Sequence, residues 1–527
     1  MTKTSPRKVL FIAADQWRWE CLSALNHPVV KTPNLDALIA DGAVFTSHFT
    51  QCTPCGPSRT SLLTGLYLMN HRSGRNGTPL DARHTNLALE ARKAGMEPTL
   101  FGYTDTSADP RGRDLNDPAL KTYEGVMPGF SVGLQLPEHA AAWVAHLKRK
   151  GYDIQGRDDA FKPRPGYQKA ADRGFRSIPT VFAAEDCQTA FIADAFLHWA
   201  SVRTEENWFA HLVFLRPHPP IIAPEPYNTM YHPKDVPAPN RKADPATEGQ
   251  QHPFLDYKIS RFRGRTGYDE HNPHDLVEMD DLELRQMRAT YYAMQTQVDD
   301  QIGRIVQFLK DSGQYDDTLI IFTCDHAEML GDHYAWGKEV YFDQSFRIPL
   351  IVRDPRKQAD GSRGSKFDAF TEAIDVMPTI LDWLGLETPQ QCDGRSLLPF
   401  LRAQQPRDWR QEAHFEADFR DIPNLHPEQS LGINSDECCY AVIRDKQYKY
   451  VHFAALPPLL FDMQADPWEM KNLADDPKMA PVVLRYAQKM LSWRLSHAER
   501  TLTHIHLKEG GPVIRPRQTW DAPKAAE

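Results

Sequence analysis

Cysteine is sparse in this chain and follows no framework. The 527 residues include eight cysteines, spread from Cys21 to Cys439, whereas small disulfide-held domains carry cysteines at a much higher density. Cys52 and Cys55 form a C-x-x-C string, which indicates thiol redox chemistry only within a thioredoxin-like βαβ unit. A disulfide scaffold is therefore excluded. A thiol redox role stays open as an alternative, and it predicts that Cys52→Ser abolishes activity.

Long apolar runs and positive charge are also lacking. No stretch approaches the roughly eighteen apolar residues of a membrane-spanning helix. The first apolar run, residues 9–14, is too short for the core of a signal peptide and ends at Asp15. The net charge is −9, from 61 Lys and Arg against 70 Asp and Glu, which argues against nucleic acid as a partner. We therefore expect a cytoplasmic protein that binds neither a membrane nor nucleic acid.

The sequence does contain a regular alternation of apolar runs and helical patterns. Buried strands are expected at residues 9–14, 99–102, 208–215, 319–323 and 348–352, and helices at 34–41, 87–94, 186–202 and 282–310. This alternation predicts an α/β domain with a large, mainly parallel sheet flanked by helices. Ligands of such sheets gather at the carboxyl ends of the strands, and polar candidate residues follow four of these runs.

The length predicts a large domain followed by a smaller one. The catalytic domain is expected at residues 1–401, with a helix over 375–385 that ends at a glycine and a loop-like insertion at about 223–279. A polar linker at 402–410 leads to a small α+β domain at 410–509. There, 438–444, 448–453 and 459–462 alternate like antiparallel strands, and 482–497 is patterned as a helix. Residues 510–527 are expected to form a tail.

One string in the chain carries a specific chemical signal. Residues 55–65 read CGPSRTSLLTG, which resembles the maturation signal of the type I sulfatases. In that family a formylglycine-generating enzyme oxidises the cysteine, here Cys55, to formylglycine. The hydrated aldehyde has two hydroxyls on one carbon. One attacks sulfur or phosphorus to form a covalent intermediate, and deprotonation of the other expels the acid group. Arg59, one helical turn further on, would stabilise the deprotonated diol.

The resemblance also implies a site for one divalent metal ion. Asp15 and Gln16 follow the first strand, and Asp325 and His326 follow a later one. Hard cations prefer oxygen ligands, and a cation here would lower the pKa of the nucleophile and offset repulsion of an anionic substrate. Many sulfatases have Asp and Asn at the Gln16 and His326 positions. This change favours Mn²⁺ over Ca²⁺, although both stay open. The implied ligands are Asp15, Gln16, Cys55, Asp325 and His326. The alternative for a lone Asp after a strand is a turn or cap residue.

Further residues are expected to bind and activate the substrate. Lys338 closes the segment GDHYAWGK, which is similar to a family segment whose Lys contacts a sulfate or phosphate oxygen. His218 follows a strand and is the expected general acid toward the leaving oxygen. Asn76 and Tyr103 are expected to donate hydrogen bonds to the anion. The alternatives are a solvated Lys, a loop His fixed by neighbouring prolines and a turn Asn.

The resemblance covers most of the chain and lies within the alkaline phosphatase superfamily, between arylsulfatases and phosphonate monoester hydrolases. Ser58 stands where phosphonate monoester hydrolases have Ala, which favours a sulfatase. Tyr103 and Asp105 stand where many arylsulfatases have a Lys-x-His pair, which favours the phosphonate and diester branch. Asp105 is expected to hold Tyr103 or to favour cationic leaving groups.

The resemblance therefore implies an arylsulfatase-type hydrolase of small sulfate esters that also accepts phosphonate monoesters and phosphodiesters. Two alternatives stay open. One is a phosphonate monoester hydrolase with sulfatase side activity, and the other is an anion-binding protein with unmodified Cys55. Relatives are often dimers or tetramers, so a homo-oligomer is expected.

Overall fold

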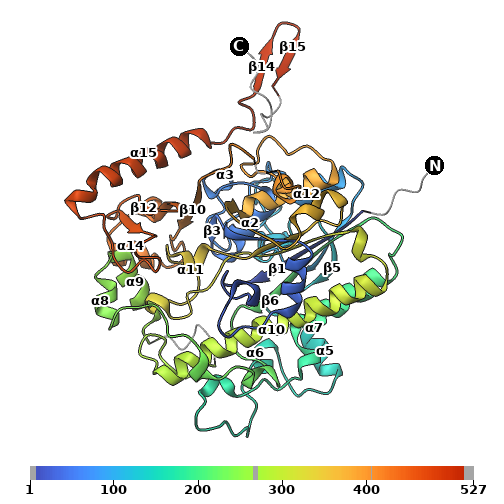
Figure 1. The fold of residues 1–527 in the computed structure, drawn as a ribbon, viewed down its shortest axis with the longest axis vertical. Helices are drawn as coiled ribbons and strands as arrows, with labels where there is room; N and C mark the ends of the chain where they lie inside the picture. The colour runs from blue at the N-terminus through green and yellow to red at the C-terminus, as the bar shows by residue number, and fades with distance from the viewer. Residues whose placement is uncertain (1–6, 265–270, 405, 516–527) are drawn as a thin grey trace.

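The computed structural model describes residues 7–264, 271–404 and 406–515 (Figure 1). Its centre is an eight-stranded sheet in the order β5-β4-β6-β1-β7-β8-β2-β9. The strands are β5 (Ser131–Gln135), β4 (Pro98–Gly102), β6 (Trp208–Pro217), β1 (Lys8–Asp15), β7 (Thr318–Cys324), β8 (Leu350–Arg353), β2 (Ala43–Phe49) and β9 (Ser365–Glu372). The predicted mainly parallel sheet is confirmed.

The central strands β6, β1 and β7 determine where the polar candidate residues lie. β1 pairs in parallel with both β6 and β7, and Lys8 lies opposite Trp208 and Thr318. All eight residues of β1 are buried. Both faces of a central parallel strand are covered, which explains why the sequence of this strand is a nearly continuous apolar run. β8 alone runs antiparallel to its neighbours β7 and β2. Three adjacent strands thus end at one edge of the sheet.

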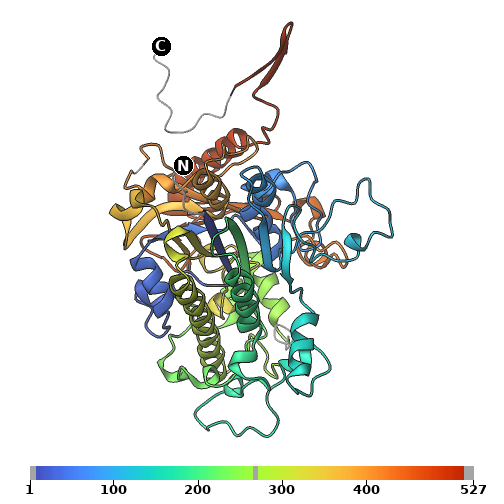
Figure 2. The ribbon, with the colours of Figure 1, turned by 90° about the vertical axis from the view of Figure 1, so that its right-hand side faces the viewer.

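Helices cover both faces of the sheet. α10 (Asp281–Asp311) packs against α7 (Gln188–Ser201) and α1 (Pro33–Ala40), and α12 (Val376–Leu384) packs against α2 (Cys55–Thr64) and α4 (Leu87–Arg92). In Figures 1 and 2 the strands lie between α10 with α7 on one side and α12 with α2 on the other. As predicted, Gly385 ends α12 with a φ of 78°, a left-handed conformation that glycine adopts without strain.

A second sheet joins the end of the chain to the residues just before Cys55. Its order is β13-β12-β11-β10-β3, made of β13 (Leu459–Asp462), β12 (Tyr448–Phe453), β11 (Cys439–Asp445), β10 (Glu412–Asp418) and β3 (Cys52–Thr53). The three strands predicted here are confirmed. β3 pairs in parallel with β10, with Cys52 opposite Glu416. α15 (Ala480–Ser496) packs on β11 and β12. The small sheet therefore supports the segment that leads into α2.

The expectation of a loop-like insertion at residues 223–279 was wrong in part. The insertion at 223–279 contains α8 (Pro245–Gly249) and α9 (Pro253–Phe262), each with proline in its first turn and a capping side chain, from Asp244 and His252 respectively. α9 buries Phe254, Leu255 and Ile259, so this segment is packed rather than loop-like. Residues 265–270 lie outside the described residues.

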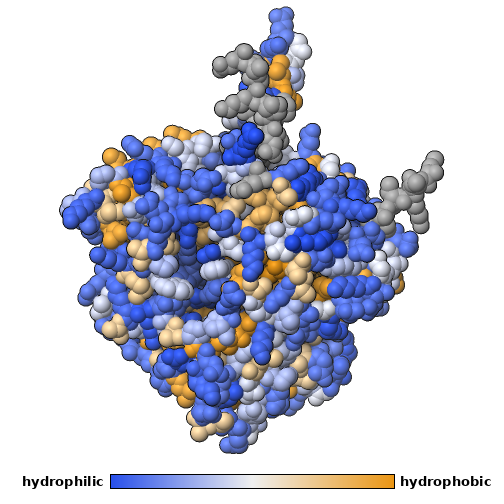
Figure 3. Space-filling model, viewed as in Figure 1, coloured by the Kyte–Doolittle hydropathy of each residue, from blue (hydrophilic) through white to orange (hydrophobic). Residues whose placement is uncertain are grey.

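The predicted tail begins as a strand. β15 (Gly511–Ile514) pairs with β14 (Ile505–Lys508) in a hairpin that projects from the body (Figures 1 and 3). Residues 516–527 lie outside the described residues, as does residue 405 in the expected linker. Within the described ranges, no helix is both long and apolar enough to cross a membrane. The expected cytoplasmic location stays a prediction.

Candidate active site

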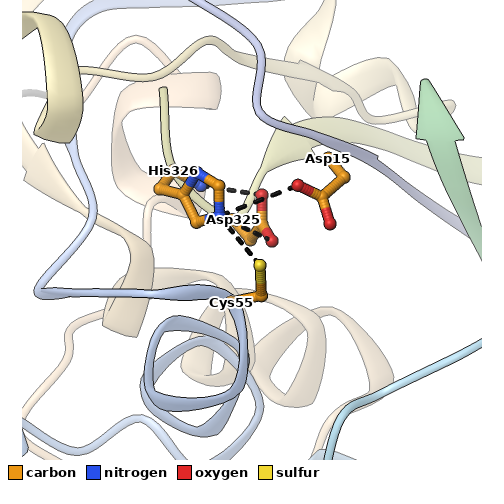
Figure 4. A group of neighbouring side chains, drawn as sticks. All are labelled: Asp15, Cys55, Asp325 and His326. Carbon is orange, nitrogen blue, oxygen red and sulfur yellow. Dashed lines mark hydrogen bonds and ion pairs between the residues drawn. The ribbon is translucent and has the colours of Figure 1, made fainter. Parts of the chain in front are cut away.

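Four predicted residues meet at one edge of the main sheet. Asp15 ends β1, Asp325 and His326 directly follow β7, and Cys55 is the first residue of α2. One ligand atom from each lies within 4.8 Å of the others, and all four side chains are buried (Figure 4). β1 and β7 are parallel neighbours, so their carboxyl ends open at the same place. α2 brings the cysteine to these ends.

Cys55 lies in an environment that keeps its thiol protonated. Burial, and then the carboxylate of Asp15, raises the pKa of the Cys55 thiol well above its usual range. Reactive redox cysteines have the opposite shift. Cys52 faces elsewhere, with its Sγ 3.4 Å from Ser61 Oγ, and burial raises its pKa as well. Both are free thiols. The surroundings therefore disfavour the redox alternative.

The cluster has the donor set that a divalent cation needs. His326 has Nδ1 3.1 Å from the carbonyl of Ala327, and its Nε2 faces Cys55 Sγ at 3.2 Å. Burial, and then the charge of Lys338, lowers the pKa of His326 well below its usual range, so the imidazole is neutral as a ligand must be. The Oδ1 atom of Asp15 is buried without a hydrogen-bond partner among the described residues. An orphaned carboxylate oxygen beside three other donors fits the coordination of a divalent cation.

Gln16 is held close to these ligands by a strained backbone. Its φ is 70°, a conformation uncommon outside glycine. Its backbone N–H donates to Asp325 Oδ1 over 3.1 Å, and its amide oxygen accepts from Lys338 Nζ over 2.8 Å. Its amide nitrogen donates to Glu328. The structure thus brings Gln16 and Lys338 together, and metal ligation by Gln16 stays a prediction.

Arg59 is the centre of a buried ion-pair network. Its Nη2 lies 2.6 Å from Asp15 Oδ2 and 3.0 Å from Asp325 Oδ2, and its Nη1 lies 2.9 Å from Asp105 Oδ2. The guanidinium stacks over the Tyr103 ring at 3.9 Å. The Tyr103 hydroxyl donates to Asp15 over 2.7 Å, and its expected hydrogen bond to the anion stays a prediction. Asp105 pairs with the guanidinium that stacks on Tyr103. A hold on Tyr103 and a preference for cationic leaving groups both stay predictions for Asp105.

A predicted cation, a predicted proton donor and one amide border the cluster. Burial opposes it, but Cys55, Asp15 and Asp325 raise the pKa of Lys338 above its usual range. Burial, and then Lys338, lowers the pKa of His218 to about 4; its Nδ1 lies 2.8 Å from the carbonyl of Pro219. Asn76 accepts from the backbone N–H of Gly56 over 2.9 Å. Its amide nitrogen is therefore the group left to donate.

Two residues support the site, of which Glu328 is not named from the sequence and Ser58 is named there only as a difference between families. Glu328 is buried and accepts from the backbone N–H groups of Leu330 and Gly337 over 2.9 and 2.7 Å. It fixes the turn before Lys338, and only its closeness to Asp325 in the sequence gave a signal. Ser58 donates to the carbonyl of Asp325 and lies 2.8 Å from Thr50 Oγ1. Its hydroxyl supports the backbone of a metal-ligand candidate, so the Ser58 difference reports on scaffold more than on substrate.

This geometry agrees with what comparison with known proteins finds. A model of the sulfatase family matches residues 7–386. The chain belongs to the sulfatase family. A model described as N-sulphoglucosamine sulphohydrolase, C-terminal, matches residues 331–496. The predicted family and its fold are thereby confirmed.

Individual relatives of this sulfatase-family chain span its whole length. The multifunctional alkaline phosphatase superfamily protein PehA of Trinickia caryophylli is 46% identical, over 97% of this chain and 99% of its own. The phosphonate monoester hydrolase structure of Agrobacterium radiobacter has 47% identity and a TM-score of 0.92, over 97% of this chain and 100% of its own. An arylsulfatase of Clostridium perfringens is 26% identical, over 96% of this chain and 98% of its own.

Proposed function

We propose that this chain is a formylglycine- and metal-dependent hydrolase of singly charged sulfate and phosphonate esters. The observation that carries this proposal is the meeting of Cys55, at the head of its sulfatase-type string, with Asp15, Asp325 and His326. A buried, protonated cysteine is a poor nucleophile. Conversion to formylglycine would supply a hydroxyl nucleophile at the same place.

The residues present fit one divalent cation. Asp15, Asp325 and His326 would hold it, with Gln16 and the modified Cys55 as the further predicted ligands, and Mn²⁺ and Ca²⁺ both remain candidates. When bound, such an ion lowers the pKa of a nearby hydroxyl and offsets the charge of an anionic substrate.

The other polar residues bind and orient the ester. Lys338 is placed to neutralise charge on the transferred group, and the amide nitrogen of Asn76 to donate to one of its oxygens. Arg59, fixed by three carboxylates, stabilises negative charge that develops one helical turn back at position 55. His218 delivers a proton to the leaving oxygen, which its ring can do only when protonated.

The choice between the two ester classes rests on the relatives. Proteins named for phosphonate monoesters are 42–47% identical along their whole length, whereas the arylsulfatase is 26% identical. The missing Lys-x-His pair at Tyr103 and Asp105 favours the same branch. We therefore expect phosphonate monoesters to be hydrolysed at least as well as aryl sulfates, with both activities in one site.

The test is kcat/KM for an aryl sulfate and for the matching aryl phosphonate monoester. It is made on protein whose conversion of Cys55 is known from mass analysis of the peptide that contains it, beside Cys55→Ala. Both activities should be lost in Cys55→Ala. If fully converted protein hydrolyses neither ester, the proposed function is wrong. An intact thiol in protein from the native host would favour the anion-binding alternative.

We also propose that the enzyme is a homo-oligomer. The hairpin of β14 and β15 supports this, because every residue of both strands is exposed. Two isolated strands are marginally stable in water and gain stability from a further packing surface.

A further inference from the structure

Asp105 is the one carboxylate of the Arg59 network that is not a metal-ligand candidate. Arg59, Asp15 and Asp325 are at most 4% exposed and Asp105 is 8% exposed. Asp15 and Asp325 share Nη2 of Arg59, whereas Asp105 alone pairs with Nη1, over 2.9 Å. Two carboxylates are enough to orient one guanidinium nitrogen. The third places an additional negative charge beside the site.

The backbone commits Asp105 to this position. It follows β4 with a φ of 49°, in the left-handed region where Asp is among the few residues tolerated. Its carbonyl oxygen would lie 3.0 Å from a Cβ added to Gly56, so the loop after β4 closes directly on the residue after Cys55. The backbone of Asp105 is therefore fixed close to α2, and the carboxylate is held there by its pair with Arg59.

The balance of fixed charges then depends on Asp105. Three carboxylates face two cations, Arg59 and Lys338, while His218 and His326 are neutral. With a divalent cation bound, these groups together would carry a net charge of about +1, and Asp105 supplies one of their three negative charges. Burial raises the pKa of Asp105 to about 7, Arg59 opposes this shift and Asp15 adds to it, so the carboxylate is mostly ionised at pH 8. A cation held by Asp15 and Asp325 would offset the contribution of Asp15.

We propose that Asp105 is a specificity-determining residue that favours singly charged esters over doubly charged phosphate monoesters. This inference rests on the proposed function and deepens it. Sulfate monoesters, phosphonate monoesters and phosphodiesters carry one charge at neutral pH, whereas a phosphate monoester loses its second proton with a pKa of about 6. The fixed carboxylate repels each unit of substrate charge, so a doubly charged ester loses about twice as much binding free energy to this repulsion as a singly charged one.

The variant that tests this is Asp105→Asn, which keeps an oxygen for Arg59 Nη1 and removes the charge. The kcat/KM values are measured for 4-nitrophenyl sulfate, 4-nitrophenyl phenylphosphonate and 4-nitrophenyl phosphate at pH 8. One unit charge a few Å away, at an effective dielectric constant of about 20, changes the preference about tenfold or more. The ratio of phosphate-monoester to sulfate activity should rise by that factor. Asp109→Asn is the matched control, because it removes a carboxylate paired with Arg111 in the same segment.

A binding measurement separates charge selection from a structural role. The Kd of inorganic phosphate, measured by calorimetry, should fall in Asp105→Asn more at pH 8 than at pH 6, because phosphate is more highly charged at pH 8. Asp105→Ser should behave in the same way, so the test survives poor folding of one variant. Equal losses for all three esters, with unchanged phosphate binding, would overturn the inference. If the parent enzyme hydrolyses none of the three, the proposed function fails instead.

Discussion

At the scale of single residues, the environment of His218 changes its protonation. Burial and Lys338 lower its pKa to about 4, so the free enzyme holds a neutral ring at pH 7. A general acid must carry its proton. We therefore expect kcat/KM, which reports the pKa of the free enzyme, to fall as the pH rises above about 4 for substrates that need protonation. The pH profile of kcat should fall at a higher pH, because a bound anion near Lys338 offsets the charge that lowers the pKa.

The leaving group tests this role of His218. His218→Ala should lower kcat/KM for a phenyl ester, whose leaving group has a pKa of about 10, by about 10²–10⁴. The loss should be much smaller for a 4-nitrophenyl ester, because that leaving group departs without a proton. Kinetics with both esters give the answer, and His139→Ala, at an exposed position, serves as control. Equal losses for both leaving groups would rule out proton donation.

Asp15 permits a direct test of the metal site. Asp15→Asn removes the charge of the orphaned carboxylate and should lower bound metal, measured by elemental analysis, well below one ion per chain. Dialysis against a chelator should abolish activity in the parent and lower its melting temperature. Adding back metal at about 100 times its Kd should restore about 2.7 kcal/mol of stability. The control Asp114→Asn, at an exposed Asp, should change neither the bound metal nor the activity. Full activity after complete metal removal would contradict the site.

The sequence predicts which residues form the ligand cluster but not all of the hydrogen bonds and ion pairs around it. Short motifs and strand ends located Asp15, Cys55, Asp325 and His326, because parallel strands bring their carboxyl ends together. The pairing of Gln16 with Lys338 and of Asp105 with Arg59 could not be predicted. Both depend on left-handed backbone turns, with φ of 70° and 49°, which local sequence patterns do not specify at non-glycine positions.

At the scale of elements, periodicity located strands but not their partners. The apolar run predicts a strand at 348–352. The direction of this strand, β8, is antiparallel to β7 and β2 and is set by long-range pairing. The two-residue strand β3 is too short to show any period. Its pairing with β10 was therefore beyond sequence analysis. This pairing joins the C-terminal sheet to the segment just before Cys55, so the sheet helps to position the nucleophile.

A buried charge cluster fastens this sheet to the catalytic part. Lys449 of β12 is fully buried and lies 3.0 Å from Asp343, in α11 (Asp343–Phe346), and 2.6 Å from Glu469. Burial opposes it, but Lys449 and Arg444 lower the pKa of Asp343, while burial raises that of Glu469. Lys449 thus neutralises Glu469 and, together with Arg444 at 3.1 Å, Asp343.

Removal of that ammonium should therefore be costly. Lys449→Met leaves Glu469 buried without its ammonium partner and leaves Asp343 with Arg444 alone, and we expect a loss of about 3–5 kcal/mol in the free energy of unfolding. Urea unfolding measures it. The control is Lys446→Met, which removes an exposed ion pair with Asp368 and should cost less than about 1 kcal/mol. Similar effects of the two substitutions would show that the cluster does not hold the sheet in place.

At the scale of the whole molecule, the hairpin of β14 and β15 is exposed along both strands within the part of the chain that the structure describes. The pairing of Ile505 with Ile514 and of Leu507 with Pro512 puts these four side chains on one face. Leu507 is 75% exposed and Ile514 is 64% exposed, and Figure 3 shows hydrophobic surface on the projecting hairpin. A cavity of about 800 Å³ lies between the base of the hairpin and residues such as Leu386 and Pro399. An apolar face that projects into solvent marks an interaction site.

The proposed homo-oligomer predicts that a second copy of the chain covers this face, since a second copy is always present in equal amount and offers the same apolar face. Leu507→Asp should lower the molar mass measured by light scattering to that of one chain, since burying a carboxylate in the contact is unfavourable. Leu115→Asp, at a leucine that is 88% exposed elsewhere, should leave the mass unchanged. The kcat/KM of the Leu507→Asp monomer should stay close to that of the parent, because the described ligand cluster is built from one chain. A parent that is already monomeric would remove the oligomer from the proposal and leave the active site as described.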